Sequence, residues 1–140
     1  MAVAAVFRGL IMVSTMLLSE ALCAVGFNRI AASLIERRLR SSPEFNDVLC
    51  MQLADIHNRG GRFEDAIQRL DDAIQQNPNN AFLYFELGFL QESRTNYDLA
   101  RDNLSRALAL SSDCSEGFRN DLRLKIDQLS EKDTKGRTRS

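Results

Sequence analysis

Histidine and cysteine, the residue types that most often serve as metal ligands or nucleophiles, are rare in this 140-residue chain. His57 is the only histidine, and the three cysteines are widely spaced. No Cys-x2-Cys or His-x3-His spacing is present that would supply zinc ligands. We therefore expect His57 to be structural, and we expect no catalytic residue, no metal site and no cofactor.

Acidic pairs and a glycine pair also lack a catalytic pattern. Glu64-Asp65 and Asp71-Asp72 are adjacent in the sequence, so a helix divides each pair between two faces, as is typical of solvated surface. Gly60-Gly61 lacks the surrounding sequence of a phosphate-binding loop and is better interpreted as the end of a helix. The sequence thus predicts a protein that is not an enzyme.

Aromatic side chains indicate binding instead. Phe82, Phe85 and Phe89 are separated by three and four residues, so a helix places them on one face. Exposed aromatic residues gathered in this way usually mark a binding site. The alternative is that a neighbouring helix or a second copy of the chain covers them.

Composition limits the class of fold and of partner. The net charge of −1 gives no electrostatic basis for binding nucleic acid. Seven glycines and two prolines are few for the turns of a sheet protein, so we expect one mostly helical domain. Three cysteines are too few for a disulfide-dense secreted fold.

Charge is distributed unevenly along the chain. Residues 1–40 hold five arginines and two glutamates, a net charge of +3, which leaves a net charge of −4 for residues 41–140.

Two segments repeat each other with a period of 34 residues, a spacing kept by Leu53 and Leu87 and by Ala66 and Ala100. Each copy contains two segments whose apolar residues recur at helical spacing, namely 47–59 and 63–76, then 81–93 and 97–110. Asn77-Pro78 ends the first copy, because a residue before proline avoids the helical region. The small residues leave room for two helices to cross closely: Ala54, Ala66, Gly88 and Ala100.

These units resemble tetratricopeptide repeats (TPRs), whose 34-residue pattern runs W-x2-L-G-x2-Y, then A-x3-F, then Ala and Pro. Unit 47–80 matches at Leu53, Ala54, Ala66, Leu70, Ala73 and Pro78. Unit 81–114 matches at Tyr84, Leu87, Gly88, Ala100, Leu104 and Ala107. Cys50, His57 and Gln91 depart from the aromatic positions of the pattern. The resemblance implies an all-α fold, in which antiparallel helix-turn-helix repeats stack as a short right-handed α-solenoid.

A further amphipathic segment follows the second repeat. In residues 115–130 the apolar positions are spaced by four, four and three: Phe118, Leu122, Ile126 and Leu129. We expect a C-terminal capping helix here, because a repeat array needs a terminal helix with a polar outer face. Residues 131–140 contain no apolar residue and are expected to be disordered.

Residues 1–45 allow three interpretations. The first is a degenerate first repeat. Gly26 and Ala31 precede Gly61 and Ala66 by 35 residues and would hold equivalent positions, and residues 42–45 resemble residues 77–80. Residues 1–45 begin with a secretory signal if Leu10–Leu18 is its apolar region and cleavage follows Ala21. They provide a membrane anchor if 1–27 spans a bilayer and the following arginines hold the repeats on the cytoplasmic side. We expect a cytoplasmic or cytoplasmic-face location, or a secreted or periplasmic one if residues 1–21 are cleaved.

The resemblance also implies a binding groove, since the first helix of each TPR lines the concave face where partners usually bind. It assigns seven residues to that groove: Val48, Met51, Asp55, Asn58, Phe82, Phe85 and Phe89. The three lysines all follow the last repeat, so we expect no clamp for a partner's C-terminal carboxylate. We expect an apolar or amphipathic protein segment as ligand, and Phe85→Glu should abolish its binding without unfolding the chain.

The function expected from this resemblance is a non-enzymatic adaptor or a small subunit of a larger assembly. The alternatives are a small TPR chaperone for a secreted or membrane client, and a membrane-tethered or envelope assembly factor. A homo-oligomer and a membrane contact through residues 1–27 both stay open.

Overall fold

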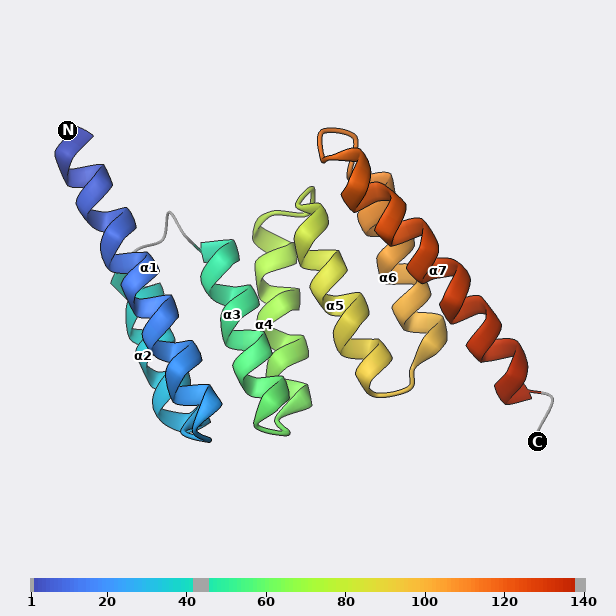
Figure 1. The fold of residues 1–140 in the computed structure, drawn as a ribbon, viewed down its shortest axis with the longest axis horizontal. Coiled ribbons are helices and arrows are strands. Elements are labelled where there is room, and N and C mark those ends of the chain that lie inside the picture. Colours follow the sequence, from blue (N-terminus) through green and yellow to red (C-terminus); the bar gives the residue numbers. More distant parts are fainter. Residues whose placement is uncertain (1, 42–45, 138–140) are drawn as a thin grey trace. The chain divides into compact units, whose positions relative to one another are not determined.

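A computed structural model describes residues 2–41 and 46–137, and within these ranges every regular element is an α-helix, which confirms the all-α prediction. Figure 1 shows these helices labelled in chain order. Their bounds are α1 Ala2–Ala24, α2 Asn28–Ser41, α3 Asn46–Arg59, α4 Phe63–Gln76, α5 Ala81–Ser93, α6 Tyr97–Ala109 and α7 Glu116–Arg137. The comparison of residues 42–45 with 77–80 lies outside the described residues.

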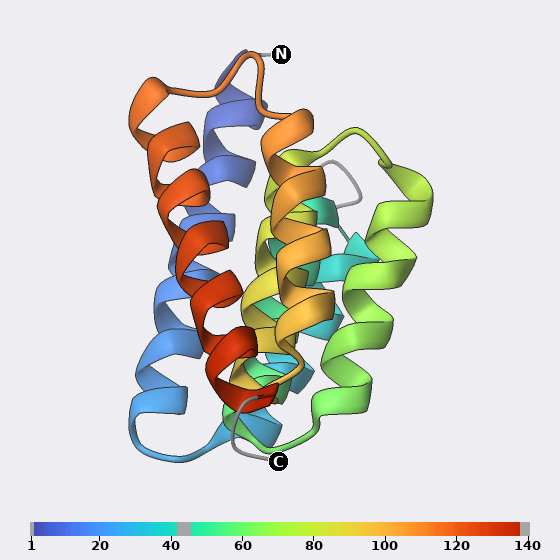
Figure 2. The same ribbon diagram turned by 90° about the vertical axis from the view of Figure 1, so that its right-hand side faces the viewer.

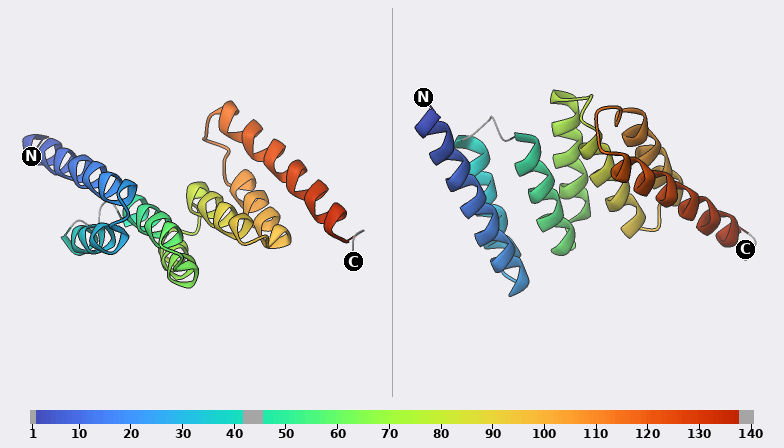
Figure 3. Two further views of the ribbon diagram at one scale, coloured as in Figure 1. Left: turned by 60° about the horizontal axis from the view of Figure 1, so that its bottom comes forward. Right: turned by 45° about the horizontal axis from the view of Figure 1, so that its top comes forward.

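The chain divides into two compact units, residues 1–69 and 70–140, and the boundary falls within α4. In the first unit, α1 and α2 form an antiparallel pair, and α2 also packs against α3 (Figure 3). In the second unit, α6 packs against both α5 and α7 (Figure 2). Each unit has its own apolar core, centred on Ile35 and Leu53 in the first and on Leu104 and Leu122 in the second.

The helix-turn-helix pairs share one kind of turn. After α3, Gly61 has a φ of +72° and the Arg62 amide donates to the His57 carbonyl at 2.8 Å. After α1, Gly26 has a φ of +85° and the Phe27 amide donates to Leu22 in the same pattern. This is the glycine-ended helix stop, in which a left-handed residue lets two amides return to the last turn.

The third turn uses the same hydrogen bonds with a threonine. Thr95 follows α5 with a φ of +64°, and the Asn96 amide donates to the Gln91 carbonyl at 3.0 Å. A β-branched residue in the left-handed region is strained, because its Cβ lies too close to the backbone. The exposed Thr95 side chain gains no burial in return.

Small residues allow close packing within the second unit. A Cβ added at Gly88 of α5 would lie 2.7 Å from Leu104 Cδ2 and 3.2 Å from the Ala100 carbonyl oxygen. Leu104 is itself fully buried, so it has little freedom to move away. The spacing of small residues predicts this close approach between α5 and α6.

Helix α1 is packed on one side only. Buried Gln52 of α3 donates from Nε2 to Ser19 Oγ at 2.6 Å and to the Met16 carbonyl at 3.1 Å. Arg59 pairs with Glu20 at 3.1 Å. Helix α1 thus supplies both acceptors of the Gln52 side-chain amide. Among the described residues one helix, Ala4–Ala24, is long and apolar enough to cross a membrane, with 6% of its residues buried.

Helix α7 runs seven residues past the end predicted at residue 130. The structure therefore differs from the expected disorder in residues 131–137, while 138–140 lie outside the described residues. The extension is held by charge rather than by apolar packing. Lys132 Nζ lies 2.8 Å from Glu92 of α5, and Asp133 lies 4.0 Å from Arg101 of α6.

His57 is a buried residue of α3 with 3% of its surface exposed. Burial lowers its pKa below the ordinary value of 6.5, and the positive charge of Arg62 lowers it further. The ring therefore stays neutral in the folded chain at neutral pH. It occupies one of the repeat's aromatic positions, as a structural residue would.

We predict that Thr95→Gly stabilises the second unit. Glycine adopts the left-handed conformation without strain, and the exposed threonine makes no packing contribution to lose, so the free energy of unfolding should rise by about 1 kcal/mol. The matched control is Gly61→Thr, which introduces the same strain at the equivalent turn and should destabilise by a similar amount. Urea denaturation measures both. A stability loss in Thr95→Gly would contradict the strain assigned to this turn.

We also predict that His57 makes stability depend on pH. Its pKa is lower in the folded state than in the unfolded state, so its contribution is complete above about pH 6.5 and is lost as pH falls below that value. His57→Phe keeps an aromatic ring in place and should flatten the free energy of unfolding between about pH 7 and pH 5. Chemical denaturation across this range measures the slope. Equal slopes in the two proteins would exclude His57 as the cause.

Candidate functional site

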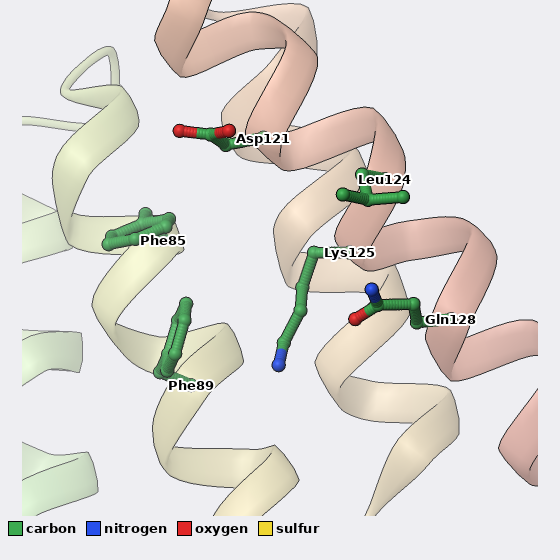
Figure 4. A pocket seen from close by; sticks show the side chains of 6 residues that line it. All are labelled: Phe85, Phe89, Asp121, Leu124, Lys125 and Gln128. Carbon is green, nitrogen blue, oxygen red and sulfur yellow. The ribbon is translucent and has the colours of Figure 1, made fainter.

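A groove lies between α5 and α7 in the second unit (Figure 4). It has a volume of about 260 Å³. Phe85 and Phe89 contribute one wall from α5, and α7 contributes the other wall: Asp121, Leu124, Lys125 and Gln128. Phe89 is 43% exposed and Leu124 is 60% exposed, so the apolar part of the groove is open to solvent.

The three predicted phenylalanines lie close together but differ in what covers them. Phe118 of α7 has its ring centroid 4.9 Å from that of Phe82 and 5.4 Å from that of Phe85. Phe85 in turn lies 4.8 Å from Phe89. The capping helix therefore covers part of the aromatic face, which is the alternative that the sequence left open. Phe82 and Phe89 keep large exposed areas.

Ion pairs connect the two helices that form the walls of the groove. Glu92 of α5 lies 2.8 Å from both Lys125 and Lys132 of α7. Burial alone raises the pKa of Glu92, but hydrogen bonds and charge from the two lysines outweigh it, so the pKa lies below its ordinary value. The carboxylate is thus ionised at neutral pH. It also holds Lys125 Nζ over the Phe89 ring, 5.1 Å from its centroid.

Local sequence explains why the two walls stand where they do. Asn80 accepts a hydrogen bond from the Phe82 amide at 3.0 Å and so caps the start of α5. Gly88 holds α5 against α6, about 100° around the helix from Phe89. Leu122 and Leu129, both fully buried, hold α7 in the same core. The groove is therefore the outer side of a packed three-helix unit.

The remaining predicted groove residues lie on α3 in the first unit. All are half-buried: Val48, Met51, Asp55 and Asn58. Asp55 pairs with Arg59 on its own helix at 2.7 Å. The continuity of these residues with the phenylalanines of α5 stays a prediction.

The structural positions of the repeat pattern are largely buried. Exposure is 7% or less at nine of them: Leu53, Ala54, Ala66, Leu70, Ala73, Leu87, Ala100, Leu104 and Ala107. Tyr84 is half-buried and lies beside the Arg106 guanidinium, whose Cζ is 5.9 Å from the ring centroid.

Sequence reasoning missed the α7 side of the groove. It assigned this helix a capping role and considered only the apolar residues expected to be buried. Leu124 was the available signal, because it is apolar and falls outside the spacing of Leu122, Ile126 and Leu129. The described residues contain no group of three His, Cys, Asp or Glu side chains suited to a metal ion, and the three cysteines are free thiols.

Comparisons with known proteins agree with this architecture. Residues 54–93 match the family described as TPR repeat. A search of curated protein sequences finds no significant match.

Three solved structures illustrate the likeness of fold. The TPR domain of Sgt2 from Aspergillus fumigatus has a TM-score of 0.70 at 15% identity, covering 89% of this chain and 80% of that one. PcrH from Pseudomonas aeruginosa has a TM-score of 0.68 at 13% identity, covering 84% and 89%. The type III secretion translocator chaperone SycD from Yersinia enterocolitica has a TM-score of 0.69 at 10% identity, covering 86% and 84%. Residues 54–93 thus match the tetratricopeptide repeat family, and the chain has an all-α repeat fold similar to that of TPR domains.

Proposed function

We propose that this protein is a non-enzymatic interaction module that binds an apolar or amphipathic helical segment of a partner protein in the groove between α5 and α7. The observation that carries the proposal is the exposure of Phe89 and Leu124 on opposite walls of one groove. Apolar side chains left open inside a hollow usually mark a binding surface.

The dimensions and polarity of the groove fit an anchor side chain better than a small cofactor. Its volume of about 260 Å³ lies below the usual range for small-molecule pockets, which begins at about 300 Å³. Its apolar centre has a border of one acid, one base and one amide: Asp121, Lys125 and Gln128. An amphipathic helix offers matching chemistry, with apolar anchors four residues apart and polar residues on either side.

Solved structures with a similar fold support the binding of a protein segment in general terms. One of them is PcrH in complex with the chaperone-binding region of PopD, with a TM-score of 0.69 and 13% identity, covering 87% of this chain and 92% of that one. That protein accommodates a segment of another chain on the same fold. A small chaperone is therefore the second candidate function, beside an adaptor or assembly subunit.

We predict that a photoreactive residue in place of Gln128 cross-links a partner in cells that express the full chain. Gln128 lines the groove and is exposed, so the label would lie beside a bound segment without removing an apolar contact. The same label at Leu99, an exposed position of α6, should not cross-link that partner. Mass spectrometry identifies the partner and the linked segment. Equal cross-linking from both positions would argue against the groove.

A peptide that spans the cross-linked segment then measures affinity. Phe89→Asp should weaken its binding at least tenfold, because the variant loses an exposed apolar contact and places a charge in the groove. Leu99→Asp is the matched control and should bind as the parent chain does. Phe85→Glu is a poorer test than the sequence implied, since Phe85 packs against Phe118 and the variant would also loosen α7.

The two candidate functions differ in what happens to the partner. A chaperone protects its client, so deletion of this chain should shorten the client's lifetime before assembly. An adaptor leaves the partner's lifetime unchanged and alters only which proteins are associated with it. A pulse-chase measurement of the cross-linked partner separates them.

A further inference from the structure

Helix α1 carries apolar residues on both its inner and its outer side. Its inner side packs Met12 and Leu22 against the apolar core of the first unit and buries Ser19 against Gln52. Its outer side presents four residues spaced by four, three and four, all at least half exposed: Val6, Leu10, Val13 and Leu17. A soluble helix places apolar residues inward and polar residues outward, so the outer side of α1 requires an apolar neighbour.

Helix α1 nevertheless belongs to the folded first unit. Its contacts with Gln52 and Arg59 are polar and specific, and its turn at Gly26 repeats the turn at Gly61. A helix that left the unit to span a bilayer would abandon both polar contacts. The neighbour of α1 must therefore cover its outer side while the inner side stays packed.

Arginines gather beside one end of this apolar side. Arg38 of α2 donates to the Arg8 carbonyl of α1 at 3.3 Å, which brings the end of α2 next to the start of α1. Arg37 and Arg40 at this end of α2 are exposed. The two acids of this helical pair are turned toward other helices, since Glu20 pairs with Arg59 and Glu36 with Arg69. Among the described residues of α1 and α2, the exposed charge at this end is therefore positive.

We propose that the first unit binds the surface of an anionic lipid bilayer, with the outer side of α1 among the acyl chains and these arginines at the headgroups. An interfacial helix binds in this way, with apolar residues in the outer hydrocarbon and basic residues near the phosphates. A second copy that packed through the same two helices would satisfy the apolar side but would set arginines against arginines, because both acids of these helices are already ion-paired. The lipid surface meets both requirements.

Vesicle co-sedimentation of the full chain tests the proposal. The chain should sediment with vesicles of phosphatidylcholine mixed with phosphatidylserine, and less with phosphatidylcholine alone. The double variant Leu10→Glu with Leu17→Glu should lose binding at least tenfold, because both side chains are more than 60% exposed and would enter the lipid. The control Leu99→Glu removes an exposed leucine of the other unit and should bind as the parent does.

A charge variant tests the headgroup contact separately. Arg37→Glu with Arg40→Glu should lower binding to the mixed vesicles by at least about fivefold for each arginine. It should leave the weaker binding to phosphatidylcholine unchanged. Equal binding of the parent chain to both kinds of vesicle would overturn the assignment of the arginines.

A tryptophan reporter keeps the test decisive if a glutamate variant fails to fold. The chain has no tryptophan, so Leu10→Trp supplies a single fluorophore on the outer side of α1. Its emission should shift to shorter wavelength when mixed vesicles are added, whereas that of Leu99→Trp should not. A parent dimer in the absence of lipid that the Leu10→Glu, Leu17→Glu variant converts to a monomer would overturn the proposal in favour of a second copy. Retention in alkali-washed cell membranes would overturn it in favour of a spanning helix.

Discussion

The close approach of α5 and α6 at Gly88 is the constraint on which the second unit depends. With Leu104 fully buried and a hypothetical Cβ only 2.7 Å from its Cδ2, the two helices meet along one side of α5. That contact fixes the rotation of α5 about its own axis, because only one position lacks a side chain. Phe82 and Phe89 then lie about 100–120° around the helix from Gly88 and stay exposed. The groove is thus a by-product of the helix crossing that forms the core.

The repeat period made most of the second unit predictable. Apolar and small residues that recur at a fixed spacing indicate which positions are buried, and Leu87, Gly88 and Ala100 are positions of this kind. Leu124 and Lys125 were missed because their role depends on Phe89, which lies far away in the sequence. The full length of α7 was missed for a similar reason. It is held by Lys132 and Glu92, which are 40 residues apart and carry no local helix signal.

The first helix shows where composition alone stops being informative. An apolar run near a chain's start has the same residue content in a signal, an anchor and a worn repeat. The structure adds the direction of one hydroxyl group, since Ser19 faces Gln52 rather than solvent. That direction depends on a partner 33 residues away, so no local pattern could have indicated it.

The double ion pair of Glu92 has a consequence for how the groove can open. Lys125 and Lys132 lie seven residues apart on α7, about two helical turns, and share one carboxylate. An incoming acidic group that formed an ion pair with Lys125 would draw the Lys125 side chain away from the Phe89 ring. Lys132 would stay paired with Glu92. Leu122 and Leu129 would meanwhile keep α7 in the core. A bound segment with an acidic group could therefore uncover the Phe89 ring by displacing one lysine side chain, without any movement of the capping helix.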